Sequence, residues 1–326
     1  MPETGNIEEL AKIVSNDIFK WFKWSTCALK DVNWKCVADH HKKKTHPSDV
    51  VFYYDDPYSG NIIYLNTDLK SYKKGSINTA SISKALSSLS ISVECANISE
   101  DWQQKYLMSD DGFDKVVGLL FIFNHDDEFD KDLVNIIEAI DFEKIDIPEN
   151  IKLVVFDPDK IRNLVNIVND LKGLVADNFL PRNDYTFFYP DMVMSKRHGD
   201  EWGQPASLEA LTSPWLIIKH RATEDIEEGF VIYYQMLGET VEEFIYLIDA
   251  MSHYQMLLSN KPIRVRFTNA SEDAANNFNK AKLEYLKMWG ADDAREVQLN
   301  RIDSRRIPKV VSNYCPMEIG MRDHAE

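Results

Sequence analysis

The sequence predicts an α/β protein built from two modules, and three observations support this. Segments with the three- to four-residue apolar period of helices alternate with β-branched and aromatic segments typical of strands. The chain has 326 residues, 44% of them apolar, which suits two domains or one large domain with a sizeable core. A turn-forming Ser-Asp-Asp-Gly at 109–112 is the best boundary. We therefore expect one module over 1–110 and an α/β, or α+β, regulatory or assembly module over 111–326.

The first module is predicted to be a mixed sheet flanked by helices. Residues 7–24 have an amphipathic helical pattern, and a short strand is expected around 34–38. Two further strands, 50–54 and 62–69, are separated by a segment dense in turn formers, which predicts a hairpin. A serine-rich helix is expected over 76–91, and residues 97–108 complete the module.

The second module shows the alternation of strands and helices that defines an α/β or α+β layer. The expected strands are 116–123, 151–156, 185–189, 215–219, 230–237, 263–267 and 297–302. The expected helices are 129–140, 161–175, 240–258 and 272–289. The sequence contains no glycine-rich phosphate loop, which argues against the common nucleotide-binding classes.

Composition and charge restrict the setting in which the protein works. The chain has no apolar run close to the roughly 20 residues that span a bilayer, and it lacks a signal-peptide pattern at its start. A cytoplasmic protein with reduced cysteines is therefore expected. The net charge of −16 argues against affinity for nucleic acid over the whole surface. However, residues 18–93 contain eleven lysines and only six acids, so this region is locally basic.

Three charged side chains are expected to meet at one end of the predicted hairpin. Side chains alternate along a strand, so Asp68 and Lys70 leave the same face. Asp49 opens the neighbouring strand and lies beside them if the two strands pair. Two carboxylates and an ammonium group would then converge at one site.

This arrangement resembles the PD-(D/E)xK nuclease superfamily, which has the restriction-endonuclease-like fold. The first half of the motif is present as Pro47-Ser48-Asp49, with one residue inserted, and the second half as Asp68-Leu69-Lys70. The resemblance covers roughly the first hundred residues. A D-x-K tripeptide alone is weak, and its value comes from the Pro-x-Asp opening, the intervening hairpin and the flanking helices.

The resemblance implies a catalytic role for Asp49, Asp68, Lys70 and Glu9. Asp49, Asp68 and the carbonyl of Leu69 would bind Mg²⁺, or Mn²⁺ in its place, and Lys70 would orient the attacking water. Glu9, or its neighbour Glu8, would hold water or a second ion, although acids at a helix start also simply favour its dipole. Asp55 or Asp56 could replace Asp49 as the first acid.

The resemblance further implies an Mg²⁺-dependent DNA endonuclease, in phage defence or restriction. The alternative is a non-catalytic DNA-binding or scaffolding subunit of a larger defence or repair complex. Under either hypothesis, the acidic C-terminal half is expected to bind a protein partner or a second copy of the chain. The lysines expected to contact DNA are Lys42, Lys43, Lys44, Lys73, Lys74 and Lys84.

Two other metal sites can be imagined from the sequence. Cys27, Cys36, His40 and His46 could form a zinc site, but neither C-x-x-C nor H-x-x-x-H spacing is present. Asp39-His40-His41 also matches the tripeptide of a family of metal-dependent phosphoesterases. That family needs further aspartate motifs, which this sequence lacks.

Overall fold

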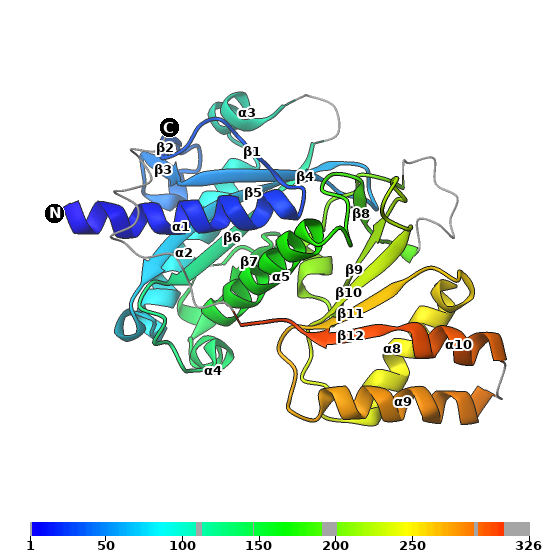
Figure 1. Ribbon diagram of the computed structural model, residues 1–326. Helices are drawn as coiled ribbons and strands as arrows, with labels where there is room; N and C mark the ends of the chain where they lie inside the picture. The colour runs from blue at the N-terminus through cyan, green and yellow to red at the C-terminus, as the bar shows by residue number, and fades with distance from the viewer. Residues whose placement is uncertain (1, 109–112, 146, 191–200, 290–292, 310–326) are drawn as a thin grey trace. The chain divides into compact units, whose positions relative to one another are not determined.

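The computed structural model describes residues 2–108, 113–145, 147–190, 201–289 and 293–309 (Figure 1). The chain divides into two compact units, with the division after Leu164. Each unit contains a five-stranded sheet with helices, so the predicted α/β class and its two sheet-containing modules are confirmed.

The sheet of the first unit has the strand order β1-β4-β5-β6-β7. Its central strand β5 pairs antiparallel with β4 and parallel with β6, so the sheet is mixed, as predicted. The predicted hairpin is formed by β4 and β5. The strands are β1 (Ser25–Thr26), β4 (Val50–Asp55), β5 (Ile62–Tyr72), β6 (Phe113–Asn124) and β7 (Leu153–Phe156).

Helices α1 (Pro2–Trp21) and α2 (Thr79–Ala96) cover opposite faces of this sheet (Figure 1). The ring of Phe19 on α1 packs against Phe52 and Phe121. The neighbouring residues Val51 and Leu120 point the other way, into the buried cluster that α2 contributes to. This alternation is the two-residue period of a strand, and it produces three layers with two buried interfaces.

A separate two-stranded sheet precedes β4 in the sequence. It pairs β2 (Val32–Lys35) with β3 (Thr45–Ser48), and the short 3₁₀ helix η1 (Asp39–His41) lies between them. The strand expected at 34–38 is thus β2, which lies outside the main sheet. Trp34 on β2 is almost completely buried and anchors this small sheet to the core.

The first unit is longer than the module predicted from the sequence. The expected boundary at residues 110 and 111 lies between α3 (Glu100–Tyr106) and β6. β6 pairs with β5 along eleven register positions, and β7 pairs with β6 in turn. Since these strands complete the sheet, the contacts place the division after Leu164, within α5 (Pro158–Ala176).

The second unit has the strand order β12-β11-β10-β9-β8. Its core lies between this sheet and helices α8 and α9. The strands are β8 (Tyr185–Phe187), β9 (Trp215–His220), β10 (Gly229–Tyr234), β11 (Ile263–Phe267) and β12 (Asp303–Arg306). The described helices wholly within this unit include α7 (Leu208–Thr212), α8 (Val241–His253), α9 (Ala274–Trp289) and α10 (Asp293–Arg301).

One predicted element of the second unit is wrong. Residues 297–302 were expected to form a strand, but α10 covers most of them and β12 begins only at Asp303. Val297 is 48% exposed, whereas Leu299 is fully buried. Residues two apart share a face in a strand but lie on nearly opposite sides of a helix, so this burial pattern fits the helix.

Among the described helices, none combines the length and apolar character needed to cross a membrane.

Candidate active site

Strand register brings the two motif halves together. β4 and β5 pair with Val50 opposite Thr67, so the next residue on each strand brings Asp49 beside Asp68. Asp49 itself lies in the bend between β3 and β4. The convergence of Asp49, Asp68 and Lys70 predicted from the hairpin is therefore present in the structure.

Direct contacts join the three residues. The backbone N–H of Leu69 donates to Oδ2 of Asp49 at 2.8 Å, which holds the bend against β5. Nζ of Lys70 donates to Oδ1 of Asp68 and forms an ion pair with it. The side chains of Lys70 and Asp68 are 29% and 18% exposed, so the pair can be reached from solvent.

The surroundings of Asp49 and Lys70 shift the pKa of each group. Burial is the larger cause and the negative charge of Asp68 the smaller cause that together raise the pKa of Asp49 to about 6. The hydrogen bond from the Leu69 N–H and the charge of Lys70 oppose this shift. Burial by itself would lower the pKa of Lys70. The charge and hydrogen bond of Asp68, together with the charge of Asp49, outweigh burial, so the pKa of Lys70 is raised. Lys70 is therefore an ammonium at neutral pH.

These residues line a pocket of about 480 Å³ between β5 and α2. Its β5 side carries Asp68 and Lys70, with Asp49 beside them, and its α2 side carries serines and one lysine. Among the described residues, the lining consists of Pro47, Asp49, Asn66, Thr67, Asp68, Lys70, Tyr72, Ser81, Lys84, Ala85, Ser88, Leu89 and Ser92. The pocket therefore holds two carboxylates and two ammonium groups, with Lys70 on the β5 side and Lys84 on the α2 side.

A buried chain of hydrogen bonds supports the pocket from below. The indole N–H of Trp34 donates to Ser48 Oγ at 2.9 Å, and Ser48 donates to Oδ1 of Asn66 at 2.5 Å. The amide of Asn66 then donates to Oγ of Ser92 at 3.0 Å. The chain links β2, β3, β5 and α2, so it fixes β5, which carries Asp68, and the end of β3, which Asp49 follows. Ser48, the residue inserted in the motif, thus has a structural role.

The alternative acids do not join this group. Asp55 pairs with Ile62 at the opposite end of β4, and Asp56 accepts the N–H of Ser59 at 2.9 Å within the turn. Glu8 and Glu9 fall in α1, but their side chains lie outside the described residues, so the role expected for Glu9 stays a prediction.

The six predicted DNA-contacting lysines differ in their surroundings. Lys42, Lys43, Lys44 and Lys73 are exposed, and Lys84 lines the pocket. Nζ of Lys43 lies 3.5 Å from Oγ of Ser88, another pocket residue. Lys74 instead forms an ion pair with Asp130 at 2.8 Å, which offsets its charge.

The cysteine and histidine group imagined from the sequence has a different membership in the structure. The thiol of Cys27 donates to the carbonyl of Tyr106 at 3.6 Å, away from the other three residues. Cys36 and His46 instead lie close to His41 and Cys95. Sequence spacing gave no signal for Cys95, because α2 brings it to the group from a distant part of the chain. Asp39 is not a member of either metal-ligand group found among the described residues.

The donor set around Asp49 and Asp68 fits a divalent cation. Two carboxylates lie together, and Lys70 forms its ion pair with Asp68. Burial first, and then the charge of Asp68, raises the pKa of Asp49, so a bound cation would favour the ionised form of Asp49. Mg²⁺ and Mn²⁺ favour oxygen ligands, and Mg²⁺ commonly uses only one or two carboxylates and keeps several waters. Lys70 lines the same pocket beside the carboxylates, where its ammonium group can donate hydrogen bonds to a bound anion.

A mixed sheet between two helices, with Asp49, Asp68 and Lys70 at one end of the hairpin, defines a nuclease-type domain of the PD-(D/E)XK class. Residues 1–160 match the family described as "GAPS4 protein PD-(D/E)XK nuclease domain". The match covers this N-terminal part of the chain and ends close to the structural division after Leu164. No curated protein and no solved structure matches the chain.

Proposed function

We propose that this protein is an Mg²⁺-dependent DNA endonuclease, with Mn²⁺ accepted in place of Mg²⁺, acting in phage defence or restriction. The observation that carries the proposal is the contact group formed by Asp49, Asp68 and Lys70 within a pocket of about 480 Å³. The family of residues 1–160 supports a nuclease-type reaction. DNA as the substrate and defence as the setting rest on the resemblance.

Each residue has a defined task in phosphodiester hydrolysis. The carboxylates of Asp49 and Asp68, with the carbonyl of Leu69, would hold the cation, which supplies a Lewis acid and a water of lowered pKa. Lys70 is a protonated ammonium beside them. It donates hydrogen bonds that orient the attacking water and offset the charge that develops on the phosphate. Glu9 would hold water or a second ion at the same site.

The lysines that surround the pocket would position the DNA backbone. Lys84 lines the α2 wall, and Lys43 reaches the same wall from the loop after η1. Lys42, Lys44 and Lys73 would add charge at the surface. Lys74 would contribute less, because Asp130 already pairs with it. The second unit would regulate the nuclease or assemble it with a protein partner or a second copy.

Plasmid cleavage tests the proposal directly. We expect purified full-length protein to nick or linearise plasmid DNA with Mg²⁺ or Mn²⁺ and to be inactive with EDTA. Lys70→Ala should lower the cleavage rate on the order of 10²–10³-fold, because it removes a preorganised cation next to the reacting phosphate. Lys115→Ala is the matched control, since Lys115 is exposed on β6 opposite Ile63, far along the strand from Asp68. DNA binding without cleavage, alone and with candidate protein partners, would instead indicate a non-catalytic subunit.

Salt dependence of DNA binding tests the basic surface. The double variant Lys43→Ala/Lys84→Ala should bind DNA more weakly at every sequence, and its slope of log affinity against log salt should be shallower by about 2. Fluorescence anisotropy with Ca²⁺ in place of Mg²⁺ measures this without turnover. Lys74→Ala is the comparison variant, and we expect it to change the slope by less than Lys84→Ala does. Equal slopes for the double variant and the wild type would place the DNA elsewhere.

A further inference from the structure

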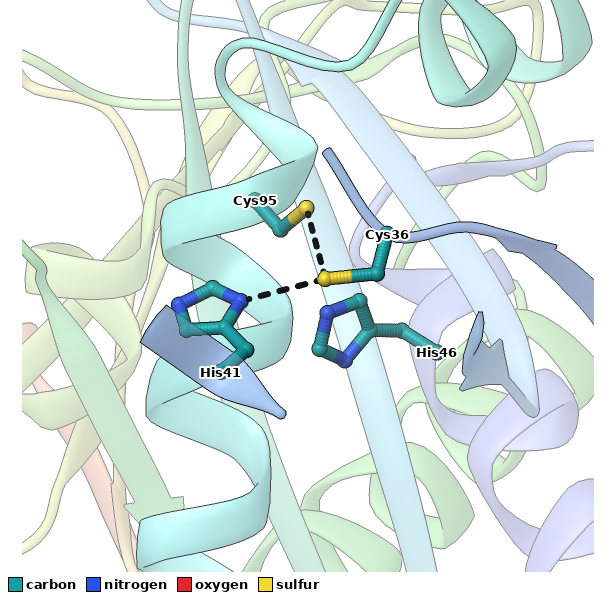
Figure 2. A group of neighbouring side chains, drawn as sticks. All are labelled: Cys36, His41, His46 and Cys95. Atoms are coloured by element: carbon teal, nitrogen blue, oxygen red, sulfur yellow. Dashed lines mark hydrogen bonds between the residues drawn. The ribbon is translucent and has the colours of Figure 1, made fainter. Parts of the chain in front are cut away.

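A second group of potential metal ligands lies in the first unit, apart from the carboxylates. Cys36 follows β2, His41 ends η1, His46 lies on β3 and Cys95 lies on α2. One ligand atom from each of the four residues lies within 4.8 Å of all the others. Figure 2 shows the two thiols and the two imidazole rings converging on a common space.

The distances within this group match a tetrahedral zinc site. Sγ of Cys36 lies 3.8 Å from Sγ of Cys95 and 3.4 Å from Nδ1 of His41 (Figure 2). A tetrahedral Zn²⁺ with Zn–S of about 2.3 Å and Zn–N of about 2.0–2.1 Å separates two sulfurs by about 3.8 Å and a sulfur from a nitrogen by about 3.5 Å. Both observed separations agree with these edges, and two cysteines with two histidines are a common structural zinc set.

His46 provides independent support, because its ring is buried without a hydrogen-bond partner. The residue is 0% exposed, and neither Nδ1 nor Nε2 has a partner among the described residues. Its ring packs against those of Trp34 and His41, with centroids 5.0 and 5.3 Å away. An unpaired polar group in such a place is costly. Coordination to a metal at the centre of the group would satisfy one of its nitrogens.

Two of the four residues, His41 and Cys95, make hydrogen bonds of the kind that support ligands at zinc sites. Nε2 of His41 lies 2.9 Å from Oε2 of Glu94, so that ring can donate to the carboxylate and keep Nδ1, which faces Cys36, for a metal. The backbone N–H of Val37 donates to Sγ of Cys95 at 3.1 Å. A backbone N–H aimed at sulfur stabilises a thiolate, the form that binds zinc.

Two other interpretations fit less well. A disulfide between Cys36 and Cys95 would need its sulfurs about 2.05 Å apart, and it would leave the orientation of both histidines unexplained. The overlapping group of His40, His41 and Glu94 has only three ligands, and the His40 side chain is 64% exposed. A metal bound by that group would use Nε2 of His41, so Nδ1, which faces Cys36, would not be a ligand.

We propose that Cys36, His41, His46 and Cys95 bind a structural Zn²⁺. The ion would tie the β2–β3 sheet and η1 to α2. Residues 36–46 contribute few apolar side chains of their own, so a metal would supply folding free energy that this segment otherwise lacks. The site would also constrain two features of the pocket: Asp49 follows His46 by three residues, and Lys42 to Lys44 lie between the ligands His41 and His46.

Metal analysis of the full-length, tag-free protein tests this inference. After purification in reductant and removal of free metal, mass spectrometry of the metal content should find about one zinc per chain. Cys36→Ser should reduce that content at least about fivefold, because a thiolate ligand is lost. Cys27→Ser is the matched control: Cys27 is a buried cysteine of the same unit, but it lies outside the group and should leave the zinc content unchanged.

A second measurement on the wild type avoids dependence on a variant that fails to fold. Replacing zinc with Co²⁺ should give the intense visible bands of a tetrahedral ion and a thiolate-to-cobalt charge-transfer band. Zinc-free protein after this preparation, absence of those bands, or a Cys36–Cys95 disulfide in peptide mapping would each overturn the inference. These readouts do not involve DNA cleavage, so they succeed or fail independently of the proposed nuclease activity.

Discussion

Asp68→Asn is expected to reduce Mg²⁺-dependent plasmid cleavage by roughly a thousandfold or more, the scale seen when one member of a catalytic group is removed. The change is nearly isosteric, but it removes a negative charge from the proposed cation site. It also takes away the ion-pair partner of Lys70, so the ammonium loses the group that orients it. Single-turnover cleavage of supercoiled plasmid at saturating protein measures the effect, and calorimetric titration with Mg²⁺ should show weaker binding.

The control for this variant is Asp55→Asn, which changes an exposed aspartate at the far end of β4. It should cleave at the wild-type rate. Circular dichroism should show that both variants are folded. If Asp68→Asn cleaves within about tenfold of the wild type, the loss is far smaller than expected for a metal ligand, and the active site lies elsewhere.

Asp49→Asn is expected to abolish cleavage while making the metal-free protein more stable at pH 8. Asp49 is partly buried beside Asp68, and its pKa is raised to about 6 by burial and by that neighbouring charge. An ionised Asp49 therefore costs the folded state free energy, on the order of 1–3 kcal/mol after allowance for solvent screening. Asparagine carries no charge, and its carbonyl oxygen can still accept the N–H of Leu69.

The pH dependence follows from the direction of this shift. A carboxyl with a raised pKa binds its proton more tightly when folded, so its favourable contribution is complete below the unfolded pKa of 3.8. That contribution is lost as the pH rises through about 6. The stability advantage of Asp49→Asn should therefore be greatest above pH 6 and should shrink toward pH 4. Urea unfolding followed by tryptophan fluorescence measures it, and hydrogen exchange of β4 and β5 reports the first unit separately.

Divalent metal should reverse the order of stability. The wild type gains stability by binding Mg²⁺ in the folded state only, whereas Asp49→Asn binds it weakly. If the metal-free variant is instead less stable than the wild type at pH 8, an ionised Asp49 does not carry the free-energy cost expected from its burial beside Asp68. Asp55→Asn serves again as the reference, because it removes a carboxylate away from the pocket.

The sequence by itself determined the elements that carry the nuclease motif. Alternation along residues 50–54 and 62–69 with a turn between them specifies a hairpin, and the two-residue period sets Asp68 and Lys70 on one face. Hairpin pairing then brings Asp49 beside them. These are local rules, so they could be applied without knowing the rest of the fold. The amphipathic pattern of α1 and the serine-rich α2 were readable for the same reason.

Only the tertiary structure decided which distant residues complete each site. β6 joins the first sheet by parallel pairing with β5, which no local pattern specifies, and the sequence therefore placed the module boundary too early in the chain relative to the observed division. Cys95 reaches Cys36 because α2 packs against the sheet, and His41 is selected over His40 by the turn of η1. Such contacts depend on packing between elements far apart in the chain, where burial and shape, rather than spacing, determine the neighbours.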